Sequence, residues 1–460
     1  MKLPLDRAVG ATRATLLEAQ RAPALLQLST DTRSLQRGDT FLALRGERFD
    51  GHAFTAEAVR CGAAALVVDD VSAAVAGVAT LVVKNAQSAY LELAGLARRL
   101  FGGMVVGITG STGKTTTRTL LEQLARVGYG DRVLAAPGNE NNEIGVSKLL
   151  LEANAERHDL VIVEMGARSY GDVATLADIA RPQIGVLTNV GEAHLEIMGS
   201  RARLADTKWA IFSRGARAVL NAADAVSRER AGTLGEPAHW FAAVDDEVHG
   251  LPDDLERLTA IVGEGRIVDR SPGGTTACDA LVRLPGRHNR CNLAAAIAAA
   301  LELDIPLRRL APAIETLELP AGRYAQLVLS QGPKLIYDAY NANASGMIAA
   351  LDAFGGEHAA RRIAVLASMA ELGEESQALH ERVGAHAARN VDVLLVSGDF
   401  AAELARGARE GGLDPSQIVL VDGNADAAAW LRDHATADDV VLLKGSRKYR
   451  LEEIVEALQA

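Results

Sequence analysis

The chain has few cysteines, few aromatic residues and no surplus of positive charge. Cys61, Cys278 and Cys291 are the only cysteines among 460 residues. They are too few and too scattered for a disulfide framework or a cysteine-rich zinc site, which fits a reducing cytoplasm. The 48 basic and 59 acidic residues give a net charge of −11. This charge argues against a broad nucleic-acid or anionic-membrane surface and leaves a local anion site open.

Long apolar runs are also missing. The longest, such as LAAAIAAAL at 293–301, fall well short of the roughly 18 residues that a membrane span needs. The first twenty residues lack a continuous apolar core with a small-residue cleavage site. We therefore expect no secretory signal, no membrane span and a cytoplasmic protein.

Short apolar runs alternate with amphipathic stretches through the middle and the end of the chain, which predicts βαβ units and an α/β fold. Apolar spacing typical of helices occurs at 118–127, 376–389, 401–412 and 425–435. Buried parallel strands are predicted at 104–109, 160–167, 183–191, 361–369, 391–398, 417–423 and 438–446.

We expect three domains. Residues 1–102 form a small mixed α/β domain, with strand-like runs at 39–46 and 63–70. Residues 103–320 form a central domain with a parallel sheet, and residues 321–460 form a Rossmann-like, doubly wound C-terminal domain. Phe-Gly-Gly and Leu-Pro-Ala-Gly-Arg-Tyr interrupt the pattern at the two boundaries.

The strongest motif is GITGSTGKTTT at 107–117, which follows a predicted strand and precedes a predicted helix. Its glycines allow several backbone N–H groups to point at one anion, while Lys114 can reach phosphates and Thr115 can offer a hydroxyl to Mg²⁺. Ile108 stands where the strict P-loop pattern has glycine, so this is a variant loop for ATP or GTP. The expected nucleotide-binding residues here are Thr109, Gly110, Ser111, Thr112, Gly113, Lys114, Thr115 and Thr116.

Three further side chains lie downstream of the loop. Glu164 ends a predicted strand and His194 follows another, at the edge where open α/β sheets bind ligands. A carboxylate at this edge suits a hard cation that bridges phosphates. The residues alone leave other interpretations open: a structural hydrogen-bond acceptor for Glu164, an ordinary loop histidine for His194, and a solvated lysine for Lys208.

Segments spread over nearly the whole chain carry a family resemblance. They are DTRSLQRGDTFLALRGERFDGH (31–52), GITGSTGKTTT (107–117), GNENNEIGV (138–146), EMGA (164–167), AHLEIMGS (193–200), LPGRHNRCN (284–292), YDAYNAN (337–343), MAELGEES (369–376) and KGSRKYRLEE (444–453). In this order they resemble the Mur ligase family. GNENNEIG, YNAN and MAELGEES are similar to its branch that adds D-alanyl-D-alanine to UDP-N-acetylmuramoyl-tripeptide.

This resemblance implies an ATP-dependent amide-bond ligase of cytoplasmic peptidoglycan precursor synthesis. Such enzymes phosphorylate a carboxylate with ATP, and an amine then attacks the acyl phosphate, so that ADP and phosphate leave. The implied cofactors are ATP and Mg²⁺, the implied partners are the two small-molecule substrates, and we expect a monomer. The N-terminal domain would bind the UDP-substrate, the central domain ATP, and the C-terminal domain the amine while closing on ATP.

The resemblance also implies roles for single residues around ATP. Lys114 would hold the transferring phosphate, and Thr115 with Glu164 would serve one Mg²⁺. His194 would serve a second, together with Lys208 if it is carbamylated. Asn292 would meet the adenine, Arg323 the phosphates and Asp338 the ribose.

Further residues resemble the substrate-binding segments of the family. Asp31, Thr32 and Arg33 would bind the uridine-diphosphate end, and Asn139, Asn141 and Asn142 would face the sugar-peptide. For the dipeptide, Lys444, Ser446 and Arg447 would meet the carboxylate, although a solvated basic turn is the alternative for these three. Asn341 and Asn343 are also expected to contact substrate.

Some residues depart from the family pattern. Arg168 follows EMGA in place of a neutral side chain, Trp209 follows Lys208 in place of glycine, and Ser368 replaces an aspartate. These departures leave open a related ligase with a different amine, and a ligase-like regulatory subunit that binds nucleotide without joining substrates.

Overall fold

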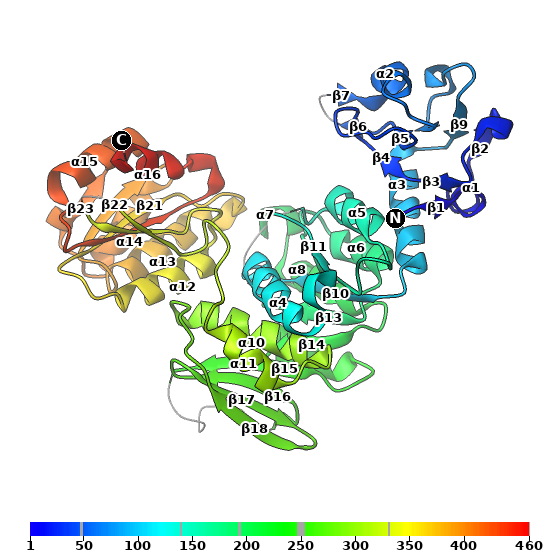
Figure 1. The fold of residues 1–460 in the computed structure, drawn as a ribbon. Helices are drawn as coiled ribbons and strands as arrows, with labels where there is room; N and C mark the ends of the chain where they lie inside the picture. The colour runs from blue at the N-terminus through cyan, green and yellow to red at the C-terminus, as the bar shows by residue number, and fades with distance from the viewer. Residues whose placement is uncertain (47–48, 139, 192–194, 246–253, 330–331, 460) are drawn as a thin grey trace. The chain divides into compact units, whose positions relative to one another are not determined.

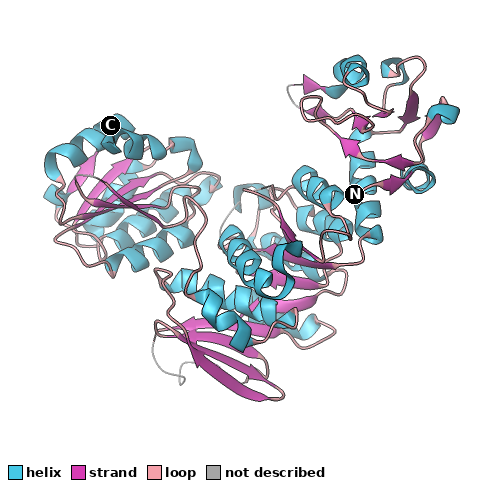
Figure 2. Cartoon of the chain, in the orientation of Figure 1, coloured by secondary structure: helices cyan, strands magenta, loops and turns pink. Residues whose placement is uncertain are grey.

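The computed structural model describes residues 1–46, 49–138, 140–191, 195–245, 254–329 and 332–459. The chain forms two compact units by its internal contacts. The first contains 1–107, 129–166 and 172–183, and the second contains 108–128, 167–171 and 184–460. Helices and strands alternate through both, so the predicted α/β class is confirmed (Figures 1 and 2).

A five-stranded mixed sheet forms the N-terminal part of the first unit. Its order is β2-β9-β8-β5-β4, and only the pairing of β2 with β9 is antiparallel. The predicted runs at 39–46 and 63–70 contain β5 and β8, so the small mixed sheet is confirmed. The strands and neighbouring elements are β1 Leu3–Pro4, α1 Leu5–Thr12, β2 Thr15–Leu17, β3 Leu25–Leu26, β4 Leu28–Ser29, β5 Thr40–Leu42, β6 Arg45–Gly46, β7 Phe49–Asp50, α2 Thr55–Arg60, β8 Ala65–Val68 and β9 Ala79–Val82.

The helix α3 joins this sheet to the rest of the first unit. It packs against α1, α5 and α6. The buried Arg98 fixes its end, because its guanidinium donates to Ala180 O at 2.7 Å and to Gln183 Oε1 at 2.8 Å. Three strands of this unit follow the order β11-β12-β10. The bounds are α3 Ala86–Leu100, β10 Met104–Thr109, β11 Val133–Ala135, α5 Glu143–Glu152, β12 Leu160–Glu164 and α6 Asp172–Ala180.

The second unit contains the strand order β13-β14-β15-β16-β17-β18. The first four are parallel, and β17 and β18 add an antiparallel edge that the sequence did not predict. The alanine-rich α10 packs against β14, β15 and β16. The bounds are α4 Lys114–Tyr129, β13 Ile184–Leu187, α7 Leu195–Met198, α8 Arg201–Trp209, β14 Arg217–Asn221, α9 Ala225–Arg230, β15 His239–Val244, β16 Leu258–Val262, β17 Arg266–Ser271, β18 Gly274–Asp279, α10 Arg287–Glu302 and α11 Leu307–Ile314.

The C-terminal sheet has the order β19-β20-β24-β21-β22-β23 and is parallel except for β19. The core on one face is formed with α12, α13 and α14, and that on the other with α15 and α16, which confirms the doubly wound prediction (Figure 1). The bounds are β19 Ala325–Val328, β20 Lys334–Tyr337, α12 Ala344–Gly355, β21 Arg362–Ala367, α13 Ser376–Ala387, β22 Val393–Ser397, α14 Ala401–Glu410, β23 Ile418–Leu420, α15 Asn424–His434, β24 Val440–Lys444 and α16 Glu452–Gln459.

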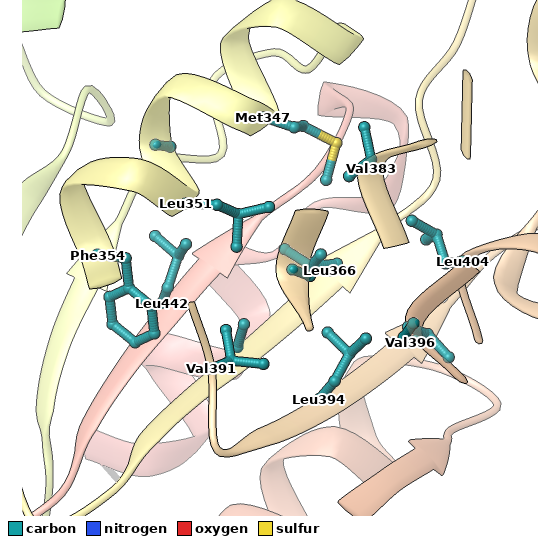
Figure 3. Close-up of a cluster of buried hydrophobic side chains, with 14 of the residues drawn as sticks. Met347, Leu351, Phe354, Leu366, Val383, Val391, Leu394, Val396, Leu404 and Leu442 are labelled. Carbon is teal, nitrogen blue, oxygen red and sulfur yellow. The ribbon is translucent and has the colours of Figure 1, made fainter. Parts of the chain in front are cut away.

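Figure 3 shows the core between this sheet and α12, α13 and α14. Leu351 and Phe354 of α12 point toward Leu366 of β21 and Leu442 of β24, and all four side chains are fully buried. Burying a side chain of this size contributes about 1.5–3 kcal/mol. This layer therefore holds β21 and β24 in place, and with them the ends of both strands. Within the described ranges, no helix has the length and apolar character needed to cross a membrane.

Candidate active site

The predicted phosphate loop connects β10 to α4, and α4 begins at Lys114. Gly110 and Gly113 have φ angles of +148° and +81°. A Cβ at Gly110 would lie 1.9 Å from Thr188 Oγ1, and one at Gly113 would lie 2.2 Å from Asn292 Oδ1. Both positions therefore require glycine. The curled backbone and the N-terminus of α4 form the anion-binding cradle that the motif predicts.

The segment 188–191, directly after β13, holds this loop. Thr188 Oγ1 donates to Thr112 O at 2.6 Å, and Asn189 Nδ2 donates to Thr112 Oγ1 at 2.8 Å. The N–H of Gly191 donates to Ser111 Oγ at 2.9 Å. These supporting residues were not predicted from the sequence. Their position at the end of a predicted strand, within TNVG, was the available signal.

Lys114 and Asn292 both lie at the loop. Lys114 Nζ donates to Gly110 O at 2.8 Å, so its charge lies over the loop. Asn292, from α10, is brought to the same place and lies 3.5 Å from Thr117 Oγ1. Thr115 is half-buried in the first turn of α4, and Thr116 is buried. The second unit thus brings Asn292 to the predicted phosphate loop from a distant part of the sequence.

Glu164 lies at the end of β12 and is only 3% exposed. Asn141 Nδ2 donates to Glu164 Oε1 at 2.8 Å, and Gly166 N–H donates to Asn141 O at 2.8 Å. The predicted substrate residue Asn141 therefore orients the predicted metal ligand. Asn142 caps α5, since its Oδ1 accepts from Gly145 N–H at 2.9 Å. The predicted residue Asn139 lies outside the described residues.

Lys208 is 1% exposed within α8, which contradicts a solvated lysine. A buried ammonium is costly unless it is paired or changes its chemistry. The predicted residue His194 lies outside the described residues. Across the described ranges, no group of three or more His, Cys, Asp or Glu side chains is arranged to hold a metal ion.

Asp338 and Lys444 form an ion pair at the carboxyl edge of the C-terminal sheet. Asp338 follows β20, Lys444 ends the neighbouring β24, and Lys444 Nζ lies 2.7 Å from Asp338 Oδ2. Their side chains are 10% and 4% exposed. The family resemblance implies separate roles for them, at the ribose and at the dipeptide. The structure instead joins them.

The remaining predicted residues of this domain have individual partners. The Arg323 guanidinium lies 4.4 Å from the centre of the Tyr340 ring. Asn341 Oδ1 accepts from Ala342 N–H at 2.9 Å, and Asn343 caps α12 by accepting from Gly346 N–H at 2.8 Å. The Ser446 N–H donates to Ser368 O at 3.3 Å, and the exposed Arg447 pairs with Glu452 at 3.0 Å.

In the N-terminal sheet region, Arg33 and Asp31 form an exposed ion pair at 2.6 Å. The hydrogen bonds from Arg33 lower the pKa of Asp31 to about 2. Thr32 Oγ1 donates to Glu57 Oε1 at 3.0 Å. Arg33 is accessible to an anionic ligand, although Asp31 already shares its charge.

Two departures from the family pattern have packing roles. Ser368 is fully buried, donates to Ser397 O at 3.2 Å and accepts from Phe400 N–H at 2.8 Å. Trp209 packs edge-to-face on Phe212 at 5.0 Å and lines a cavity of about 600 Å³. Arg168, shortly after β12, is exposed.

A second cavity, of about 460 Å³, adjoins the segment that supports the phosphate loop. Gly191 and Val190 line it from that segment, and Ser345 and Ile348 line it from α12. Arg201, Asp352 and Arg382 supply charge. Two cations and one anion therefore line this one cavity beside the loop-supporting segment.

Three family descriptions match consecutive parts of the chain. Residues 26–98 match the Mur ligase family catalytic domain, residues 108–300 the Mur ligase middle domain, and residues 322–447 the Mur ligase glutamate ligase domain.

Individual proteins are similar over nearly the full length. A UDP-N-acetylmuramoyl-tripeptide–D-alanyl-D-alanine ligase of Synechocystis sp. is 36% identical over 440 residues, which cover 94% of this chain and 92% of that protein. The crystal structure of MurF from Acinetobacter baumannii superposes with a TM-score of 0.85 at 26% identity, covering 100% and 99% of the two chains. The MurF ligase of Thermotoga maritima in complex with ADP gives 0.78 at 28% identity, covering 94% and 97%.

Proposed function

The chain belongs to the Mur ligase family, and we propose that it joins D-alanyl-D-alanine to UDP-N-acetylmuramoyl-tripeptide. It is an ATP-dependent amide-bond ligase that forms ADP and phosphate. The observation that carries the substrate assignment is the 36% identity, over 94% of this chain, to a ligase of that activity. The two substrates are small molecules of peptidoglycan precursor synthesis, and we propose that the reaction takes place in the cytoplasm.

The chain's residues position and neutralise charge in this reaction. ATP supplies the phosphoryl group that turns a poorly electrophilic carboxylate into an acyl phosphate. The backbone N–H groups of the phosphate loop and the Lys114 ammonium hold the phosphates, and the Thr188 and Asn189 side chains keep the loop in shape. Positioning of this kind is the main contribution of a protein to phosphoryl transfer.

Mg²⁺ fits the oxygen donors available. Thr115 has a hydroxyl in the first turn of α4, and Glu164 is a buried carboxylate oriented by Asn141. Hard oxygen ligands of this kind suit Mg²⁺, which neutralises phosphate charge when bound. We assign one ion to Thr115 and Glu164, and a second to His194 and Lys208.

Lys208 is the proposed site of carbamylation. Its neutral amine would add to CO₂ and release a proton, which replaces a buried cation with an anion able to hold Mg²⁺. A Lys208→Ala variant should lose activity and regain part of it with short carboxylic acids. Absence of rescue, together with absence of a CO₂ adduct on Lys208 in a crystal structure, would remove this role.

The nucleotide and the dipeptide are proposed to meet at the C-terminal sheet edge. Asn292 is assigned to the adenine, Arg323 to phosphates and Asp338 to the ribose. Lys444 and Ser446, with Arg447, are assigned to the dipeptide carboxylate, near Asn341 and Asn343. Because Lys444 and Asp338 are paired at 2.7 Å, a ligand that contacts one is coupled to the other.

The acceptor substrate is assigned to the N-terminal domain and the central domain. The segment Asp31–Arg33 would bind its uridine-diphosphate end, and Asn139, Asn141 and Asn142 would face its sugar-peptide. The proposed domain boundaries lie near residues 102 and 320, and the proposed enzyme is a monomer.

The test is phosphate release with ATP and Mg²⁺, omitting the tripeptide substrate and D-alanyl-D-alanine in turn. We expect release to require both. Release that ignores both substrates would refute the ligase activity. Turnover with another amine in a competition assay would identify a related ligase, and nucleotide binding without amine-dependent turnover would identify a regulatory subunit.

A further inference from the structure

The loop 369–376 connects β21 to α13, and one buried histidine fastens both of its ends. His380 of α13 is fully buried. Its Nε2 lies 2.8 Å from the N–H of Met369, where the loop begins, and its Nδ1 lies 2.6 Å from Ser376 O, where the loop ends. The ring also stacks on Phe400 with centroids 4.5 Å apart.

The two partners define the protonation state of this ring. A backbone N–H only donates, so Nε2 must carry a lone pair, and a backbone carbonyl only accepts, so Nδ1 must carry the proton. His380 is therefore neutral in this arrangement. Protonation of Nε2 would replace the hydrogen bond to Met369 with a clash between two donors.

The loop that His380 fastens borders the proposed dipeptide site. It starts at the end of β21, where Leu366 pairs in register with Lys444 of β24. The residue before it, Ser368, accepts from Ser446 N–H. The backbone at 369 thus continues directly from the residues that support Lys444 and Ser446.

The other end of the loop reaches the helix that carries Lys208. The short turn at Gly373–Glu375 contacts α7, and Glu375 lies 3.7 Å from Arg201 in the first turn of α8. Glu371 and Gly373 have φ angles of +62° and +59°. A left-handed conformation at a non-glycine residue such as Glu371 needs support from its surroundings, and the two hydrogen bonds to His380 hold the loop on either side of it.

We infer that His380 is a positioning residue for the incoming dipeptide: its ring holds residues 369–376 so that they border the Lys444 edge and meet α7 and α8. This inference rests on the proposed function for the identity of the substrate. His380 itself touches no proposed substrate group and acts through the loop.

Burial supports this role. It lowers the pKa of His380 from the ordinary value of 6.5, although the hydrogen bond to Ser376 and the charge of Glu403 on α14 oppose it. The neutral, loop-holding form therefore persists at neutral pH and is lost only under acid conditions.

The kinetic test compares His380→Phe with His380→Gln in the full-length enzyme. Phenylalanine keeps the stack but bonds neither end of the loop, whereas glutamine offers an acceptor and a donor. We expect His380→Phe to raise the KM for D-alanyl-D-alanine about tenfold and to leave the KM for ATP within about twofold. His380→Gln should recover most of the difference. The exposed His434→Phe is the matched control and should change neither constant.

The pH profile adds a readout that packing alone would not give. Because burial lowers the pKa of His380 below its ordinary value of 6.5, the KM of the wild type for the dipeptide should stay constant near neutral pH and rise only at more acid pH than 6.5. The same rise should be smaller in His380→Gln. An equal change of all substrate constants in His380→Phe, or an identical acid profile in wild type and His380→Gln, would overturn the inference.

Hydrogen–deuterium exchange separates this inference from the proposed function, because it needs no substrate. His380→Phe should speed exchange in the amides of 369–376 and leave the β21 and β22 amides unchanged. Unchanged exchange in the loop would overturn the inference even in an active ligase. Dipeptide-independent turnover of the wild type would overturn the proposed function and leave the exchange result to decide the role of His380.

Discussion

The phosphate loop and the Asp338–Lys444 edge each follow a buried strand, but they are built in different ways. The loop depends on the absence of side chains at two glycines, because Cβ atoms at Gly110 and Gly113 would collide with Thr188 and Asn292. The C-terminal edge depends on charges that are present and paired at 2.7 Å. The first is therefore sensitive to added volume, and the second is sensitive to the removal of either partner.

The largest expected effect is at the charged edge. Lys444→Met leaves the Asp338 carboxylate buried and unpaired, so we expect the free energy of unfolding to fall by about 3–5 kcal/mol and ligation to be lost. Urea titration measures the first and phosphate release the second. Lys448→Met is the matched control, because Lys448 pairs with Asp399 at the same 2.7 Å but the two side chains are 62% and 63% exposed.

We expect that control to leave the free energy of unfolding almost unchanged, because solvent screens an exposed ion pair. The double variant Lys444→Met with Asp338→Asn should lose less stability than Lys444→Met alone, since no unpaired charge remains. Equal losses in the buried and exposed pairs would contradict the comparison.

Added volume in the phosphate loop should come next. Gly113→Ala forces a methyl group toward Asn292 Oδ1, and we expect turnover to fall about 100-fold because the phosphates are misplaced. Gly130→Ala is the control: its φ is +59°, but nothing lies within 4 Å of its Cβ.

The control carries backbone strain without crowding. It should lower the free energy of unfolding by about 1 kcal/mol and leave turnover unchanged. Steady-state kinetics and thermal unfolding of both variants check this. A turnover loss of the same size in both would show that strain alone matters.

A smaller effect should follow removal of the support beneath the loop. Thr188→Val deletes the donor to Thr112 O at 2.6 Å, and we expect the KM for ATP to rise about tenfold. Thr12→Val deletes a buried donor of the same kind, to Ala8 O at 2.8 Å in α1, and serves as control. A rise in the KM for ATP in the control as well would mean that general stability, rather than loop shape, is measured.

The smallest effect is expected at the other end of β24. Burial raises the pKa of Asp439, but hydrogen bonds from Arg361 and Thr436 prevail and lower it below 3.8. The depressed pKa stabilises the fold above 3.8, and this contribution is lost as the pH falls through the folded-state value. Urea titrations at decreasing pH should show a shallower acid loss in Asp439→Asn. If the free energy of unfolding falls with pH equally steeply in Asp439→Asn and in the wild type, Asp439 is not the source of the acid loss.

The sequence predicted most of the regular structure because buried parallel strands appear as unbroken apolar runs. The predicted runs at 361–369, 391–398 and 438–446 contain β21, β22 and β24. Two strands at 266–279 were missed because half-exposed antiparallel strands such as β18 resemble loops in composition. The buried parallel strands β14, β15 and β16 were also missed, although each is an apolar run of the kind recognised elsewhere in the chain. The phosphate loop was also predictable from the sequence, because its motif, the strand before it and the helix after it are contiguous in the chain.

Contacts between distant residues were not predictable in this way. Nothing near Lys208 in the sequence indicates that the side chain is 1% exposed. The pairing of Asp338 with Lys444 depends on the adjacency of β20 and β24, which the order of elements along the chain does not specify. The hydrogen bond from Thr188 to Thr112 likewise depends on how the segment after β13 lies beside the phosphate loop, which the sequence does not specify.

The contact between the phosphate loop and the first turn of α12 has a thermodynamic consequence. A methyl group at Gly346 would lie 3.6 Å from Thr112 Cγ2, so the loop and the capped end of α12 touch within one compact unit. Whatever rigidifies the loop also restrains α12. Nucleotide should therefore protect residues 344–355 from proteolysis, and a cleavage assay with a protease could report occupancy of the phosphate site without any turnover.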